Sequence, residues 1–185
     1  MSPRLAFVVV SALAASLAVA ADEYPAVQRK IDRIESDTLA RGARVELTPG
    51  ELSAYAAHQA PEGVRDVKLS ISAPEIATGA AVVDFEKLGR GQGWRSGHLL
   101  GVLLGGERPI SVTARIRSSG GQATVDVHRV VIGGLEIQGA TLDFLIRTVL
   151  MPLYPDAKIG KPFELSHRIE RLDVQPRGVG VVIGR

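Results

Sequence analysis

The stretch of residues 109–132, PISVTARIRSSGGQATVDVHRVVI, decides the fold of this protein. Two extended runs flank Gly120-Gly121, and in the first run apolar residues occupy every second position: Ile110, Val112, Ala114 and Ile116. Side chains alternate between the two faces of a strand, so this period of two is typical of a strand with one apolar face. Two such runs joined by a glycine pair predict a β-hairpin.

Further extended runs lie on both sides of this hairpin. Val67, Leu69 and Ile71 alternate with polar residues, and residues 76–85 continue as a second run, so the two predict another hairpin. Short strands are expected at residues 44–47, 163–165, 169–174 and 179–183, with a turn at Pro176-Arg177-Gly178 between the last two. Strands that follow one another through short turns pair in antiparallel fashion.

Two helices are predicted near the start of this region. Residues 25–41 have the spacing of an amphipathic helix, which is expected to end at Gly42. Thr48-Pro49-Gly50-Glu51 has the pattern of a capping box, which predicts a second helix through about His58. Thr48 and Glu51 are therefore interpreted as helix caps rather than as catalytic groups.

Two further helices are strongly apolar. A glycine-rich loop at residues 89–97 leads into a short helix at residues 99–104, and the most regular helical spacing covers residues 142–153, where Pro152 and Pro155 end it. The predicted fold class is α+β, with a curved antiparallel sheet wrapped around or packed on one long and two or three shorter helices. Residues 22–185 are expected to form a single domain.

The N-terminal segment indicates export. Arg4 precedes an apolar stretch over residues 5–19, and Ala18-Val19-Ala20 fits the small-x-small rule for cleavage, with Val19-Ala20-Ala21 as the alternative register. Residues 1–21 are therefore predicted to be a signal peptide that is cleaved near Ala20 or Ala21, which places the protein in the periplasm or outside the cell. An uncleaved N-terminal anchor is the alternative interpretation.

Composition restricts the possible functions further. The chain contains no cysteine, which excludes disulfides, thiolate metal sites and a lipid-modified cysteine. Lys and Arg total 22 against 20 for Asp and Glu, and the two signs are interspersed, so the charge gives no support for binding nucleic acid. Hydrophobic residues make up 45% of the chain but aromatic residues only 4%, so its core is aliphatic.

No motif of catalysis or metal binding is found. His58, His98, His128 and His167 lack metal-ligand spacing, and the serines form neither a G-x-S-x-G elbow nor an S-x-x-K pair. The glycines of residues 89–94 lack the strand and helix of a dinucleotide loop. Carboxylates that could be posed as acid pairs, Glu164 with Asp173 and Asp84 with Glu86, are typical of solvated strand positions. No catalytic residue, metal site or cofactor is predicted.

The two apolar helices are apolar around more than one narrow stripe, so they must be buried or face something apolar. One interpretation is a packed α+β core without a ligand. The other is a cleft between these helices and the concave face of the sheet that holds an acyl chain, because an aliphatic lining offers burial and dispersion contacts. The residues expected to line it are Leu99, Leu100, Leu103, Leu142, Leu145, Ile146, Val149 and Leu150.

The order of three segments and the helix behind them resembles the small single-module bacterial members of the tubular lipid-binding (TULIP) superfamily. The segments are residues 45–52 (VELTPGEL), 67–71 (VKLSI) and 125–135 (VDVHRVVIGGL). The resemblance implies a curved antiparallel sheet around a long helix, with a lipid in the groove and no enzymatic activity. It fixes no binding residue, and the chain departs from the exported lipoprotein members because it has no lipobox cysteine.

Three functions follow from these observations. The leading hypothesis is a periplasmic domain that binds or transfers a lipid or another apolar small molecule, with at most peripheral membrane contact. The second is a ligand-free module that binds another protein of the cell envelope. The third, an exported hydrolase, requires two histidines, or a histidine and a carboxylate, to come within hydrogen-bonding reach.

Overall fold

The computed structural model of this chain describes residues 23–87, 105–147 and 159–184. The fold is α+β, as predicted, and all named strand pairs are antiparallel. After a helix over residues 23–35, the elements are β1 (Arg44–Leu47), α2 (Pro49–His58), β2 (Val64–Ala73), β3 (Ile76–Asp84), β4 (Glu107–Ser119), β5 (Gln122–Ile132), β6 (Leu135–Ile137), α5 (Gly139–Leu145), β7 (Phe163–Glu164), β8 (Ile169–Gln175) and β9 (Gly178–Ile183).

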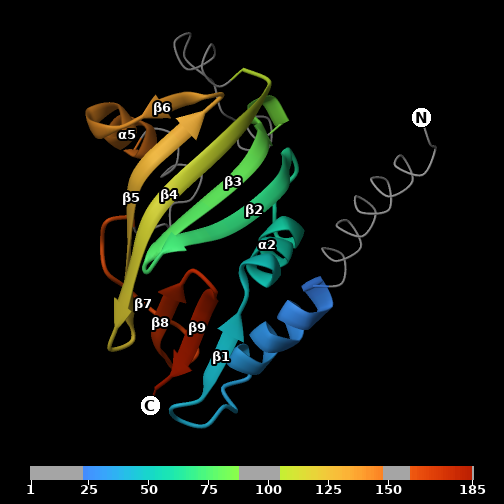
Figure 1. The fold of residues 1–185 in the computed structure, drawn as a ribbon, viewed down its shortest axis with the longest axis vertical. Helices are drawn as coiled ribbons and strands as arrows, with labels where there is room; N and C mark the ends of the chain where they lie inside the picture. Colours follow the sequence, from blue (N-terminus) through green and yellow to red (C-terminus); the bar gives the residue numbers. More distant parts are fainter. Residues whose placement is uncertain (1–22, 88–104, 148–158, 185) are drawn as a thin grey trace, which may run out of the picture.

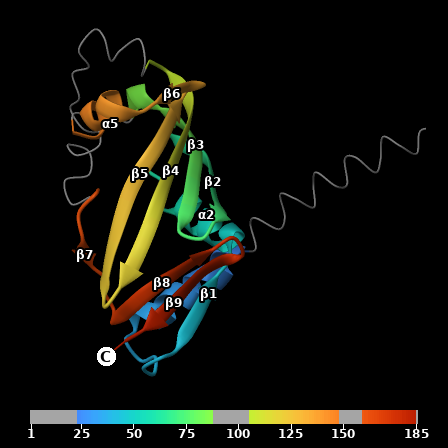
Figure 2. The same ribbon diagram turned by 60° about the vertical axis from the view of Figure 1, so that its left-hand side comes forward.

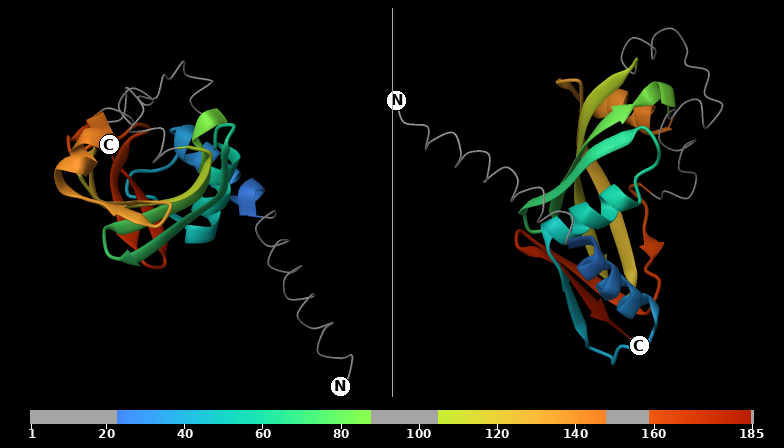
Figure 3. Two further views of the ribbon diagram at one scale, coloured as in Figure 1. Left: turned by 90° about the horizontal axis from the view of Figure 1, so that it is seen from above. Right: turned by 90° about the vertical axis from the view of Figure 1, so that its right-hand side faces the viewer.

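These strands form a large and a small sheet, one above the other in Figure 1. The large sheet has the order β2-β3-β4-β5-β6, with β7 paired to the lower end of β5, and the small sheet has the order β1-β9-β8. The large sheet is a curved meander, which Figure 3 shows from above. Gly120 and Gly121 both have positive φ, 57° and 77°, at the tight turn between β4 and β5, so the predicted hairpin is confirmed.

The first helix is shorter than its pattern predicts. It covers residues 23–35, and Gly42, with φ +79°, donates its amide to the carbonyl of Ile183 at 2.8 Å instead of capping a helix. The helix packs Val27 and Ile34 against β1 and β9 of the small sheet. Asp37 has φ +55°, which ends helical geometry soon after Ile34 and returns the chain toward β1.

The capping box of α2 is present as predicted. The Thr48 hydroxyl accepts a hydrogen bond from the Glu51 amide at 3.1 Å, and the Glu51 carboxylate accepts one from the Thr48 amide at 2.8 Å. Glu51 is only 7% exposed and forms an ion pair with Lys30 of the first helix at 2.6 Å. One carboxylate therefore caps α2 and ties it to the first helix.

This arrangement predicts a loss of stability in acid. Burial by itself raises the pKa of Glu51, but hydrogen bonds from Lys30 and from the Thr48 amide outweigh it, so the pKa lies below its ordinary value of 4.5. A group whose pKa is lower in the folded state stabilises the protein above that ordinary value. We expect stability to fall as the pH drops below about 4.5, and Glu51→Gln to reduce this dependence.

The measurement is the urea midpoint of unfolding between pH 6 and pH 3 for the original protein and for Glu51→Gln. The exposed Glu62 supplies the matched control, Glu62→Gln. A pH profile of Glu51→Gln that equals those of the original protein and of Glu62→Gln would contradict this prediction.

The two sheets are joined through the free edge of β8. The Ser118 hydroxyl of β4 donates to the Leu172 carbonyl at 3.0 Å and accepts from the Leu172 amide at 2.7 Å. The Glu75 amide donates to the Val174 carbonyl at 3.0 Å, and the Gly121 amide to the Glu170 carbonyl at 2.8 Å. The small sheet therefore closes the lower end of the large one, as Figure 2 shows.

Several predicted elements lie partly or wholly outside the described residues. The predicted loop at residues 89–97 and the predicted apolar helix at residues 99–104 fall outside them, as do the predicted signal peptide and the second half of the predicted helix at residues 142–153. Of that last helix the structure describes α5, which begins at Gly139 rather than at residue 142. None of the helices within the described ranges has the length and apolarity needed to cross a membrane.

Candidate functional site

One face of the large sheet is aliphatic from edge to edge. Leu69, Gly79, Val112, Val130 and Ile137 lie directly opposite one another in register and form a row across all five strands from β2 to β6. Directly opposed residues share a face of an antiparallel sheet, and we call this one the inner face. The neighbouring rows are also apolar: Ile71, Ala77, Ala114 and Val127 on one side, and Ala81, Ile110, Ile132 and Leu135 on the other.

The two ends of the inner face are covered by different elements. At the upper end Leu142 of α5 and Phe85 pack with Val83, Ile132 and Ile137 in one buried cluster. At the lower end β8 crosses the sheet, where its backbone bonds to Ser118. Leu69, Gly79 and Val112 lie between these ends and are half-buried.

The opposite, outer face is polar. Three ion pairs link strands on it: Arg65 of β2 reaches across β3 to Glu107 of β4 at 2.8 Å, and Arg117 with Asp126 and Arg129 with Glu136 each join neighbouring strands at 2.7 Å. The hydroxyls of Thr78 and Thr113 also bond across β3 and β4 at 2.9 Å. The large sheet thus has one solvated face and one aliphatic face, so an apolar ligand would have only the inner face to contact.

Two of the predicted lining residues have described side chains. Leu142 is 6% exposed and belongs to the upper cluster, against which Ile146 packs. Leu145 is the last residue of α5, and its side chain lies outside the description. The other predicted lining residues, Leu99, Leu100, Leu103, Val149 and Leu150, also lie outside the described residues.

Sequence reasoning missed the row through Leu69, Gly79, Val112 and Val130. The alternation within each strand was visible, but the row depends on the register between strands. That register includes bulges in β2, between residues 65 and 68, and at the pairing of β4 with β5, between Thr113 and Ala114. A bulge shifts the alternation of inward and outward side chains along its own strand by one residue. In β5 the inner positions pass from Val127 to Val130 across the polar pair His128-Arg129, and this break in the alternation is the signal that could have indicated the bulge.

Among the polar residues that the sequence offers for chemistry, His58, Asp173 and Asp84 make structural contacts. The ring of His58 stacks on Tyr24 at 3.8 Å, and His128 and His167 are exposed. Hydrogen bonds from Gln175 and Arg44 lower the pKa of Asp173, and the Lys87 amide lowers the pKa of Asp84, so both carboxylates are ionised at neutral pH. Within residues 23–87, 105–147 and 159–184, no three His, Asp or Glu side chains are grouped to hold a metal ion.

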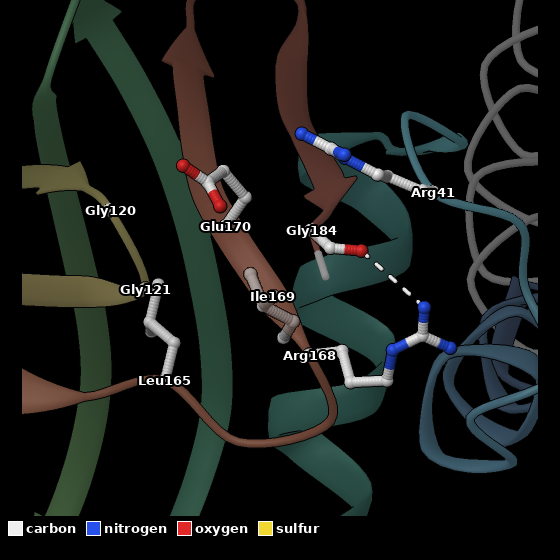
Figure 4. A pocket seen from close by; sticks show the side chains of 8 residues that line it. All are labelled: Arg41, Gly120, Gly121, Leu165, Arg168, Ile169, Glu170 and Gly184. Carbon is white, nitrogen blue, oxygen red and sulfur yellow. Dashed lines mark hydrogen bonds between the residues drawn. The ribbon is translucent and has the colours of Figure 1, made fainter.

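A cavity of about 510 Å³ lies where the turn between β4 and β5, the segment before β1 and the start of β8 meet (Figure 4). Its charged lining residues are Arg41, which precedes β1, and Arg168 and Glu170, at the start of β8. The backbone of Gly120-Gly121, the backbone of Gly184 and the apolar side chains of Leu165 and Ile169 complete the lining. Arg168 donates to the carbonyls of Asp37 at 3.0 Å and of Gly184 at 3.4 Å.

Comparison of this chain with protein-family models, curated proteins and solved structures finds no match.

Proposed function

We propose that this protein is an exported, non-catalytic carrier that holds an acyl chain or a similar apolar molecule against the inner face of its large sheet. In this proposal residues 1–21 direct the chain to the periplasm and are removed there. The proposal includes the relation to the tubular lipid-binding superfamily, in which a groove between sheet and helix holds a lipid.

The observation that carries the proposal is the aliphatic row across five strands, whose members Leu69, Gly79, Val112 and Val130 are half-buried. Each methylene group that such a surface removes from water contributes about 0.8 kcal/mol to binding. An aliphatic surface offers an acyl chain dispersion contacts along its length, and it has no need of the stacking that aromatic ligands require.

Gly79 adds a shape argument. A β-carbon on Gly79 would lie 3.3 Å from the Cδ2 atom of Leu69, so the Leu69 side chain leans over the glycine. Val112 flanks Gly79 on the other side. Gly79 itself places no side chain at the centre of the row, where Leu69 and Val112 supply the apolar surface that a flexible chain would contact.

The direct test is to express the full chain with its leader and to purify it from a periplasmic extract. Native mass spectrometry should reveal bound lipid, and an apolar fluorophore should bind the delipidated protein and be displaced by a fatty acid. Protein that carries no lipid and binds no fluorophore would exclude the carrier function.

A pair of matched variants locates the ligand. Val112→Trp places a large ring in the centre of the inner row and is expected to reduce fluorophore binding at least about tenfold, because it fills the space of the chain. Val131→Trp is the control, because Val131 is half-buried on the outer face, between Ser111 and Glu136. Binding is measured by fluorescence titration, after circular dichroism has established that both variants are folded.

A milder variant keeps the test valid if Val112→Trp does not fold. Gly79→Ala adds one methyl group to the inner face, against the flexible end of Leu69. It should keep the fold and still weaken binding. Equal binding by Gly79→Ala, Val131→Trp and the original protein would place any ligand elsewhere.

A further inference from the structure

We propose that the cavity at Arg41, Arg168 and Glu170 binds a compound in which a phosphate group and an ammonium group lie close together. The phosphate is bound by the two guanidinium groups and the ammonium by the carboxylate. This proposal is independent of the carrier function, since a small soluble compound would be bound in the same way as a lipid headgroup.

The two arginines carry charge that the described residues do not neutralise. The Arg41 side chain has no hydrogen bond or ion pair within the described part of the chain, and the Arg168 guanidinium bonds there only to the carbonyls of Asp37 and Gly184. Carbonyl bonds orient the Arg168 guanidinium and leave its positive charge available. Arginine is well suited to phosphate, because its planar group donates two parallel hydrogen bonds.

Glu170 supplies the opposite charge. Its carboxylate lines the same cavity, near the backbone of Gly184, and no described cation lies within ion-pairing distance of it. Figure 4 shows the Arg41 side chain extending above Gly184, with Glu170 on one side of that glycine and Arg168 on the other. A simple anion would be attracted by two groups and repelled by the third, whereas a zwitterion has a favourable partner for all three.

Backbone hydrogen bonds hold the cavity walls, together with the bonds from the Arg168 side chain. The Gly121 amide bonds to the Glu170 carbonyl at 2.8 Å, and the Gly184 amide bonds to the Arg168 carbonyl at 2.7 Å. Arg168 and the preceding His167 have positive φ, 57° and 55°, which only a constraining surrounding maintains. Arg168 and Glu170 are therefore presented from fixed backbone positions, and this lowers the entropy lost on binding.

The test uses the processed full chain and two probes, O-phosphoethanolamine and inorganic phosphate, in isothermal titration calorimetry. O-phosphoethanolamine should bind more tightly than phosphate. Arg41→Gln should weaken the binding of both probes about tenfold, because it removes a charged hydrogen-bond donor. Arg171→Gln is the control, because Arg171 is exposed on the same strand, outside the cavity lining, and should leave both affinities unchanged.

Glu170→Gln separates this proposal from a general attraction of anions. It should strengthen phosphate binding, because a repulsive charge is gone, and weaken O-phosphoethanolamine binding, because the partner of the ammonium is gone. Absence of binding by both probes, equal effects of Arg41→Gln and Arg171→Gln, or a change of the same sign for both probes in Glu170→Gln would each overturn the proposal.

Vesicles distinguish the two sources of this chemistry. If the natural ligand is a lipid headgroup, the protein should bind vesicles that contain phosphatidylethanolamine, and soluble O-phosphoethanolamine should release it. If it is a free phosphate compound, the soluble probe should bind in the same cavity and the vesicles should not.

Discussion

Replacing Gly178 with alanine is expected to destabilise the protein by about 3–5 kcal/mol, the sum of backbone strain and a steric clash. Gly178 begins β9 and has φ +148°, a conformation that side chains rarely adopt. A β-carbon there would lie 2.3 Å from the carbonyl oxygen of Leu47. The obstacle is backbone at the end of β1, which cannot move without disturbing the small sheet.

Urea denaturation followed by circular dichroism measures this effect. Gly120→Ala is the matched control, because Gly120 also has positive φ, +57°, but a β-carbon there meets nothing within 4 Å. The free energy of unfolding of the control should fall by only about 1–2 kcal/mol, because alanine is strained in the left-handed conformation. Equal losses in the two variants would show that the approach of β9 to Leu47 is looser than described.

Truncation of Leu142 to alanine is expected to cost about 2–5 kcal/mol, the range for a buried leucine that leaves a cavity. Leu142 is 6% exposed and packs with Val83, Phe85, Ile132 and Ile137. It anchors α5 to the upper end of the inner face, so its loss should loosen that end as well as lower the stability.

Phe144, two residues along α5, provides the contrast. It is 53% exposed, so Phe144→Ala should change the free energy of unfolding by less than about 0.5 kcal/mol. Both free energies come from urea unfolding curves. A loss below about 1 kcal/mol in Leu142→Ala would mean that α5 is not anchored through this side chain.

These variants also separate two roles that sequence reasoning combined. Leu142 and Ile146 were predicted to line a ligand cleft, and both pack at the covered upper end of the inner face. The half-buried part of that face is the row through Leu69, Gly79 and Val112. Leu142→Ala therefore tests the stability of the upper end, and Val112→Trp tests the surface proposed for the ligand.

The sequence by itself determined the elements whose causes are local. The capping box of Thr48 and Glu51 requires partners three residues apart, and the turn at Gly120-Gly121 requires two residues that tolerate positive φ. The alternation in residues 109–132 determined two long strands with one aliphatic face. Each of these signals lies within a few residues of the feature it specifies, so each could be found without knowledge of distant contacts.

Only the tertiary structure decided the features that depend on residues far apart in the chain. The end of the first helix before Gly42 follows from the return of the chain to the small sheet, where the Gly42 amide bonds to Ile183. The aliphatic row depends on register across five strands, including the bulges in β2 and in the pairing of β4 with β5. The cavity gathers Arg41, Arg168 and Gly184 from distant segments. Side-chain periodicity specifies which face of each strand is apolar. Strand register and chain reversal specify which residues lie side by side on that face and which elements cover its two ends.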